Sequence, residues 1–194
     1  MNERKKKGIQ QIAFGAILLA VAGGFYWFGN RAEKVNNFEE CLKAGHPVME
    51  SYPRQCQTPE GKTFNEDIGN ELEKDEMIRI SEPRPNTFIS SPLVVKGMAG
   101  GNWFFEASFP VRLFDGNGEQ LARGIAQAQG NPAGGGVNWM TNELVPFEAT
   151  LSFETPTATT GTLLLDKDNP SGFPENRDAL RVPVRFKQKT RPPP

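Results

Sequence analysis

The chain has 194 residues, of which 37% are hydrophobic and 23% charged, and its formal net charge is −1. This composition is too apolar for a disordered chain and too evenly charged for a nucleic-acid-binding protein. One histidine and two cysteines leave few residues for a zinc centre, a haem attachment site or a histidine-based dyad, so we expect no enzyme, cofactor or metal site. The 20 glycines, 16 prolines and 14 phenylalanines favour short strands joined by turns.

The N-terminus has the features of a membrane anchor. A basic cluster, Arg4 to Lys7, precedes an uncharged apolar run from Ile12 to Gly29. As a helix, this run would span about 27 Å, close to the ~30 Å hydrocarbon core of a bilayer. Because basic residues stay on the cytoplasmic side, residues 1–29 are expected to form a single-pass signal anchor, with the bulk of the chain outside the cytoplasmic membrane. The alternative is a cleaved signal peptide, for which Ala20-Val21-Ala22 is a suitable cleavage site.

Residues 30–67 are expected to form a small segment closed by a disulfide. Cys41 and Cys56 are the only cysteines, and outside the membrane they would lie in an oxidising compartment, where thiols pair. Closing a loop of this length stabilises the segment by about 3 kcal/mol in the chain-entropy model. A Kazal-type inhibitor would need three disulfides, and a redox pair would need a closer cysteine spacing. We therefore interpret the bridge as structural, with a solvated acidic linker following it at residues 68–77.

From residue 78 the hydrophobic pattern changes to a period of two, which is typical of half-buried strands. The alternation is clearest along residues 105–113, 145–153 and 182–186, with shorter candidates at 78–81, 93–98, 120–128 and 162–167. The stretch Asp115-Gly116-Asn117-Gly118 has the residues that a tight hairpin turn needs. The pattern predicts an all-β fold over residues 78–188, an antiparallel immunoglobulin-like β-sandwich of about seven strands. A Pro-rich tail, residues 189–194, follows it.

Six blocks occur in order within this region: Ser90–Gly97, Trp103–Ala107, Asp115–Gly118, Trp139–Thr141, Pro146-Phe147 and Asp168–Gly172. Together they resemble the bacterial immunoglobulin-like domain that is associated with the sporulation and germination protein GerM. The stretch from Glu39 to Phe64 also resembles a two-cysteine motif that precedes such domains in exported bacterial proteins. The resemblance implies an extracytoplasmic, non-catalytic module of the bacterial envelope.

Two pairs of large apolar residues, each with a tryptophan, are the candidate binding residues. Trp103-Phe104 and Trp139-Met140 each follow a glycine-rich stretch, near a junction between a loop and a strand. If the pairs meet at one end of the sandwich, they form an aromatic platform for a sugar or a peptide. Alternatively, the tryptophans plug the core between the sheets. The oxygen-bearing side chains of Asp115, Asn117 and Glu119 supply only part of a calcium shell, and a turn explains them as well.

The sequence therefore predicts a single-pass protein of the bacterial cytoplasmic membrane that displays a binding or scaffolding module outside. Its expected mode of action is protein–protein interaction in an envelope assembly, and the resemblance implies a link to sporulation or germination. The alternative is a carbohydrate-binding module for cell-wall glycan, which exposed side chains of Trp103 and Trp139 would favour. Nucleic acid is not expected as a partner, because residues 30–194 carry a net charge of −4.

Overall fold

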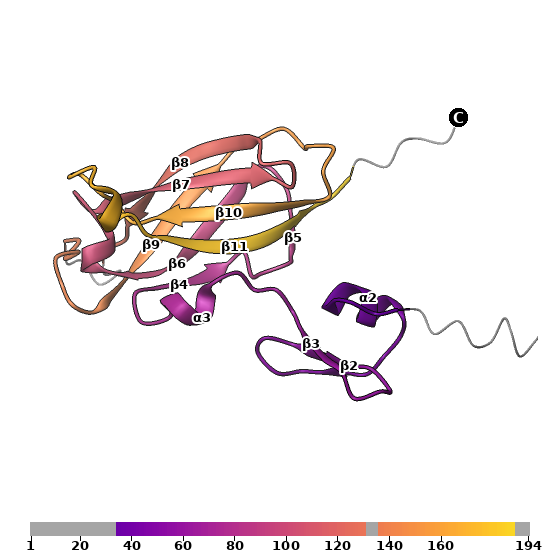
Figure 1. Cartoon of the computed structure of the whole chain (residues 1–194). Coiled ribbons are helices and arrows are strands. Elements are labelled where there is room, and N and C mark those ends of the chain that lie inside the picture. The colour runs from indigo at the N-terminus through magenta and orange to yellow at the C-terminus, as the bar shows by residue number, and fades with distance from the viewer. Residues whose placement is uncertain (1–33, 131–135, 189–194) are drawn as a thin grey trace, which may run out of the picture. The chain divides into compact units, whose positions relative to one another are not determined.

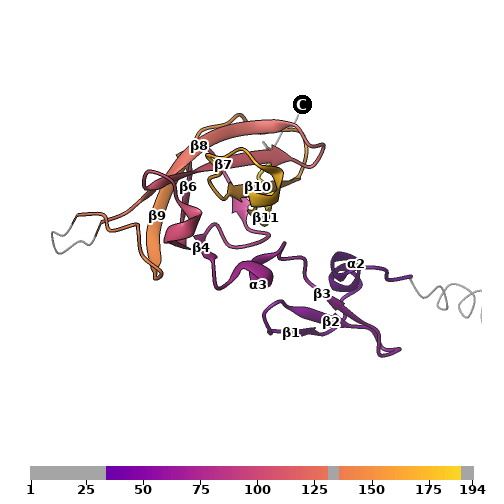
Figure 2. The same cartoon turned by 60° about the vertical axis from the view of Figure 1, so that its left-hand side comes forward.

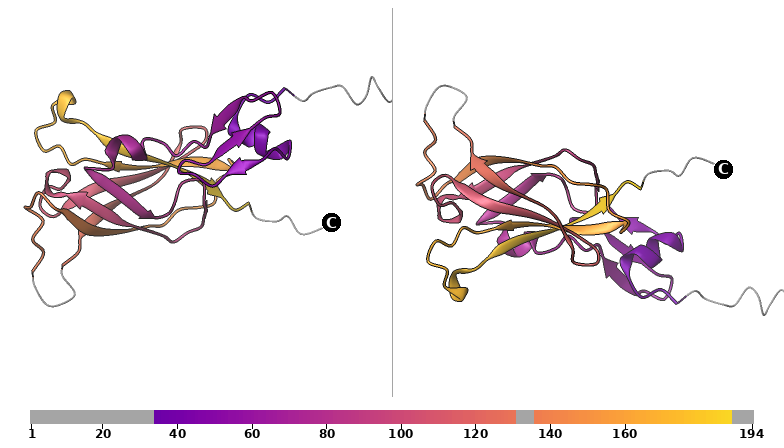
Figure 3. Two further views of the ribbon diagram at one scale, coloured as in Figure 1. Left: turned by 90° about the horizontal axis from the view of Figure 1, so that it is seen from below. Right: turned by 90° about the horizontal axis from the view of Figure 1, so that it is seen from above.

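The computed structural model describes residues 34–130 and 136–188, which Figures 1, 2 and 3 show from different sides. The predicted anchor, residues 1–29, and the tail, residues 189–194, lie outside the described residues. No helix within the described ranges is long and apolar enough to cross a membrane. The chain divides into two compact units, Met1–Glu66 and Asp67–Pro194.

The described part of the first unit consists of one helix and a small sheet. Its elements are α2 (Phe38–Lys43), β1 (Val48–Met49), β2 (Gln55–Gln57) and β3 (Thr63–Asn65), with the strands antiparallel in chain order. Helix α2 begins after Asn37, whose side-chain oxygen accepts a hydrogen bond from the Glu40 N–H at 2.9 Å. The Glu40 carboxylate accepts one from the Asn36 N–H at 2.8 Å, which lowers the pKa of Glu40. Both bonds stabilise the first turn of α2.

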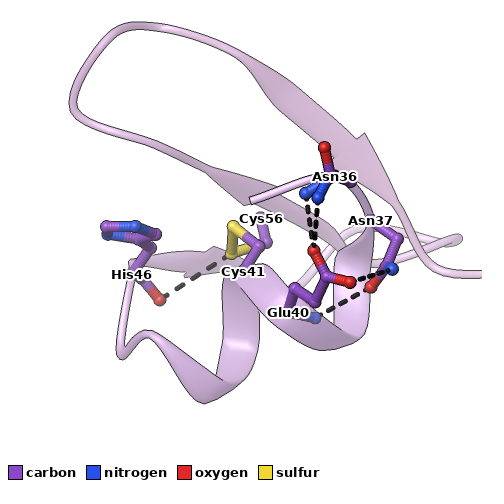
Figure 4. Close-up of a disulfide and its surroundings, with 6 residues drawn as sticks. All are labelled: Asn36, Asn37, Glu40, Cys41, His46 and Cys56. Carbon is purple, nitrogen blue, oxygen red and sulfur yellow. Dashed lines mark hydrogen bonds between the residues drawn. A yellow bond between two sulfur atoms is a disulfide. The ribbon is translucent and has the colours of Figure 1, made fainter. Parts of the chain in front are cut away.

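The Cys41–Cys56 disulfide joins α2 to β2 (Figure 4), as the sequence predicts. Both cysteines are fully buried, and with Phe38 they form the buried cluster of this unit. The side chains of Val35, Val48 and Phe64 pack against that cluster. Since three buried residues make a very small hydrophobic core, the covalent bridge is the main constraint on the fold of this unit.

The second unit is one curled sheet of eight strands (Figures 1 and 3). The strands are β4 (Ile78–Glu82), β5 (Phe88–Ile89), β6 (Leu93–Gly100), β7 (Ser108–Asp115), β8 (Gln120–Ala128), β9 (Leu144–Leu151), β10 (Thr160–Asp166) and β11 (Ala179–Phe186). Their order across the sheet is β4-β6-β9-β8-β7-β10-β11-β5. All neighbours are antiparallel except β11 and β5, which are parallel.

The mostly-β class is confirmed, but the predicted pair of antiparallel sheets is replaced by a single mixed sheet. The sheet has two halves, β4-β6-β9 and β8-β7-β10-β11-β5. They are joined where β8 pairs with β9, through only two residue pairs, Gln127 with Glu148 and Ala128 with Phe147. The additional strand, β5, has two residues and is too short to show an alternating pattern. Its parallel pairing with β11 makes the sheet mixed.

The hydrophobic core fills the inside of the curled sheet. The predicted alternation places Phe109, Val111 and Leu113 inward from β7, and the same pattern buries Val145, Phe147, Ala149 and Leu151 of β9 and Val182, Val184 and Phe186 of β11. These side chains belong to one continuous buried cluster. The core therefore joins the two halves of the sheet through apolar packing.

Two glycines let phenyl rings lie directly on the sheet backbone. A Cβ atom at Gly97 would lie 2.6 Å from Cζ of Phe147, the residue opposite it on the neighbouring strand. A Cβ atom at Gly161 would lie 2.6 Å from Cε2 of Phe186. Because glycine has no Cβ, each ring covers bare backbone, an arrangement that suits strongly curved sheets.

The segment before β4 covers the free edge of β11. Strand β5 pairs with only the last two residues of β11, Arg185 and Phe186. Further back along that edge, the Asn70 side chain donates from Nδ2 to the Ala179 carbonyl at 3.0 Å and accepts from the Arg181 N–H at 2.7 Å. Asn70 thus takes the place of a neighbouring strand and satisfies backbone groups that an open edge would expose.

This segment differs from the solvated linker that its charges predict. Ile68, Asn70 and Glu71 are buried, and a short helix, α3 (Glu71–Lys74), begins there. The Lys74 ammonium lies 2.7 Å from Oδ1 of Asp178. Residues 68–77 therefore belong to the fold of the second unit.

We predict that Gly97→Ala lowers the free energy of unfolding by roughly 1–3 kcal/mol, because the added methyl group would clash with the Arg79 carbonyl oxygen and lie 2.6 Å from the Phe147 ring, and both would have to shift. The measurement is chemical denaturation followed by tryptophan fluorescence. Gly136→Ala is the control, since a Cβ there meets nothing within 4 Å, and its effect should stay within about 0.5 kcal/mol. Equal effects of the two substitutions would contradict this account of the sheet.

We also predict that the double variant Cys41→Ala, Cys56→Ala destabilises the first unit by about 3 kcal/mol. Hydrogen exchange measures this, and the amides of α2, β2 and β3 should lose protection, because the bridge is their main constraint. Amides of β7, β10 and β11 serve as the internal reference. Unchanged protection in α2 would show that the small apolar cluster suffices.

Candidate functional site

Three loops meet at one end of the curled sheet, on the left in Figure 1. They are residues 101–107 between β6 and β7, 129–143 between β8 and β9, and 167–178 between β10 and β11. The Gly101 N–H donates to the Thr141 carbonyl at 3.1 Å, and the Asp168 N–H donates to the Trp103 carbonyl at 3.1 Å. These bonds link the first loop to each of the others. We call the described residues of these loops the loop end.

Trp103 is buried at the centre of the loop end. It closes the 3₁₀ turn η1 (Gly101–Trp103) and is only 1% exposed, and the next residue, Phe104, is 5% exposed. The Phe104 ring lies 5.2 Å from the Phe109 ring, which in turn lies 5.0 Å from the Phe147 ring. The two side chains therefore extend the hydrophobic core to the loop end of the curled sheet.

The other predicted pair lies nearer the surface. Trp139 is partly buried and packs against the core, whereas Met140 is 76% exposed. The prediction that Trp103, Phe104, Trp139 and Met140 form an exposed platform is therefore corrected. The side chains of Trp103 and Phe104 instead fill the space between the two halves of the sheet. For Trp103 the alternative prediction, a plug in the core, describes its position.

The indole of Trp103 is held by apolar packing rather than by hydrogen bonds. Its Nε1 is buried and has no hydrogen-bond partner among the described residues. An indole N–H usually finds an acceptor when it is buried, because leaving the donor unpaired costs free energy. Burial of the large apolar ring offsets that cost.

Exposed apolar side chains gather on the three loops. Of the nine large hydrophobic residues exposed in the described part of the second unit, four belong to the loop end: Phe105 at 44%, Val137 at 41%, Met140 at 76% and Phe173 at 59%. We call these four residues the loop-end apolar set. The sequence indicated only Met140, because Phe105 continued an alternating run and the loop positions of Val137 and Phe173 carry no periodic signal.

Phe105 is exposed because a strained turn follows it. Glu106 and Ala107 have φ angles of 50° and 59°, which lie in the left-handed region that non-glycine residues rarely adopt. The Phe105 N–H donates to the Ser108 carbonyl at 2.9 Å, and the Ser108 N–H donates back at 3.0 Å. This two-residue hairpin turn interrupts the predicted strand 105–113, so β7 begins at Ser108.

Asn-Gly is the favoured pair for such a turn, and each L-residue in the left-handed region costs roughly 1–2 kcal/mol. Strain of this kind persists only where the surrounding structure holds it, and it is frequent at functional sites. Here the turn presents Phe105 at the loop end.

The Asp115 side chain stabilises the turn between β7 and β8. Its Oδ1 atom accepts hydrogen bonds from the N–H groups of Asn117 at 2.9 Å and Glu119 at 2.8 Å. Hydrogen bonding to these backbone groups, that of Glu119 foremost, lowers the pKa of Asp115. No group of three His, Cys, Asp or Glu side chains within residues 34–130 and 136–188 is arranged to hold a metal ion.

We predict that the double variant Glu106→Asn, Ala107→Gly raises the free energy of unfolding by about 1–2 kcal/mol, because both new residues accept positive φ. Thermal and chemical denaturation measure the change. Glu106→Gln is the control, since it removes the charge but keeps the strained backbone, and its stability should match the wild type. A destabilised double variant would contradict the description of the turn.

Residues 77–172 match the family Gmad2, described as the immunoglobulin-like domain of bacterial spore germination. This confirms the resemblance that the sequence blocks indicate, and it assigns the immunoglobulin-like character of the curled sheet. The matching segment extends from the residue before β4 into the loop after β10. No curated protein and no solved structure matches the chain.

Proposed function

We propose that this chain, whose residues 77–172 form a Gmad2 immunoglobulin-like domain of bacterial spore germination, is a membrane-anchored binding module that contacts a protein partner through its loop end. The basic cluster Arg4 to Lys7 and the apolar run from Ile12 to Gly29 support the anchor. The Cys41–Cys56 disulfide supports an extracytoplasmic location, because such bridges persist in oxidising compartments.

The concentration of exposed apolar residues at the loop end carries the proposal. Loops at the end of a rigid sheet are a common place for binding residues, because the scaffold positions them while their sequences remain free to vary. Burying the side chains of Phe105, Met140 and Phe173 against a partner would remove apolar surface from water, which contributes about 25 cal/mol for each Å². Aromatic residues and methionine are also enriched at the centres of protein interfaces.

Cell-wall glycan remains the second candidate ligand, but the observation that would favour it is missing. Aromatic sugar-binding sites need an exposed ring face, and Trp103 is 1% exposed. Trp139 is only partly exposed. A protein partner fits the loop-end apolar set better, because bulky aliphatic and phenyl side chains pack well against an apolar protein surface.

The test is site-specific photocrosslinking in the bacterium that encodes the chain, with the full-length protein in its own membranes. A photoreactive residue at Phe105, Met140 or Phe173 should give a discrete adduct with another protein. Ile125 is the matched control, because it is 47% exposed and apolar but lies on β8, outside the loop end. Adducts of equal yield at Ile125, or none at the three loop positions, would contradict the proposal.

A second measurement separates the glycan candidate. Full-length protein in non-ionic detergent is mixed with purified cell-wall sacculi and centrifuged. Under our proposal, Met140→Asp with Phe173→Asp abolishes the adduct formed by a photoreactive residue at Phe105, while the wild type does not pellet with sacculi. Pelleting of the wild type that the double variant loses would favour the glycan.

A further inference from the structure

A polar groove of about 730 Å³ lies on the sheet beside the loop end, because six of its lining residues belong to loop 167–178. Its charged lining comes from β7, β8, β10, β11 and the loop 167–178, and includes Arg112, Arg123, Asp166, Lys167, Arg177 and Arg181. The residues before and after Arg112 and Arg181 along their strands are buried. Since side chains alternate along a strand, these arginines stand on the outer face of the sheet, opposite the core.

Three of the arginines share one row of the sheet. Arg112 of β7 lies directly opposite Arg123 of β8 and, on its other side, opposite Leu164 of β10. Leu164 in turn lies opposite Arg181 of β11. With neighbouring strands about 4.8 Å apart, the row from Arg123 to Arg181 spans about 14 Å. That span is longer than a single phosphate or carboxylate group.

Only one member of the row is neutralised by an ion pair. Arg112 forms two hydrogen bonds of 2.6 Å with the Asp166 carboxylate, which raise the pKa of its guanidinium. Arg123, Lys167, Arg177 and Arg181 make no ion pair with any residue in the described ranges.

Acidic residues in the groove do little to compensate these cations. Asp166 is used by Arg112, and Asp178 pairs with Lys74, which leaves Asp168 as the remaining carboxylate. Like charges across neighbouring strands destabilise a sheet. Residues 67–194 as a whole are acidic, with 13 Lys and Arg against 16 Asp and Glu, yet five of those cations line this groove. Arg123 and Arg181 thus have no acidic partner among the described residues of the groove, and a bound anion would supply the missing negative charge.

We propose that the groove binds a linear, phosphate-bearing polyanion, which lies across the strands and contacts Arg123 and Arg181. The arginine fork matches the oxygens of a phosphate group, and several such contacts in a row favour a ligand with repeating charges. Lys167 and Arg177, from the loop beside the row, extend the positive surface.

The lining argues for a polyanion over an acidic peptide. Few apolar side chains, among them Pro110 and Ala179, face the groove, so a peptide would have little hydrophobic surface to bury. The backbone groups below the groove are already used in the ladders between β7, β8, β10 and β11. A peptide therefore could not add as a further strand there, and charge remains the main source of affinity.

The test measures binding of fluorescently labelled polyphosphate to the full-length chain in non-ionic detergent, by fluorescence anisotropy. Arg123→Gln with Arg181→Gln should weaken binding by roughly tenfold or more. The matched control is Arg79→Gln with Lys96→Gln, which removes the same charge from exposed positions on β4 and β6, and binding should change by less than about twofold. Thermal unfolding checks that both double variants are folded.

A second double variant and a second polyanion complete the test. Lys167→Gln with Arg177→Gln should also weaken polyphosphate binding, since both side chains border the row. Poly-glutamate should bind at least about tenfold more weakly than polyphosphate of similar charge. Equal loss in the Arg79 and Lys96 control, unchanged binding in the Arg123 and Arg181 variant, or equal affinity for poly-glutamate would each overturn the proposal.

Discussion

The close contact between a phenyl ring and a bare glycine backbone is the constraint on which the second unit depends. Phe147 lies on Gly97 in one half of the sheet, and Phe186 lies on Gly161 in the other. Each ring occupies the space that a Cβ would take, so it packs directly on the inner face of the curled sheet. Phe109 lies between the halves, with its ring 5.0 Å from that of Phe147, so that a single sheet encloses the kind of core that usually needs two.

A sheet that curls without closing leaves its ends and edges open, and side chains from outside the strands help to cover two of these places. Trp103 fills the inside of the curled sheet at the loop end, where it is 1% exposed. Asn70 covers the free edge of β11 with two hydrogen bonds to its backbone. Both residues lie outside the strands, and each covers backbone or core that an open sheet would expose to water. The segments between strands are thus part of the fold.

The outer surface of this unit carries two regions of different chemistry. The loop end presents apolar side chains on loops that hydrogen bonds hold together, which suits a protein partner. The groove on β7, β8, β10 and β11 presents arginines on a rigid sheet, which suits an anion with repeating charges. One region relies on apolar side chains and the other on charged ones, and loop 167–178 contributes residues to both.

The sequence by itself determined the mostly-β class, the disulfide and the inward faces of the main strands. Alternation with a period of two shows which side of a strand a residue such as Val111 or Val184 occupies, and two cysteines allow one intramolecular pair. The pattern could not show the burial of Trp103, the strained turn that exposes Phe105, or the row of Arg123, Arg112 and Arg181. Those features depend on which strands are neighbours and in which register, and residues distant in sequence decide that pairing when the sheet curls around its core.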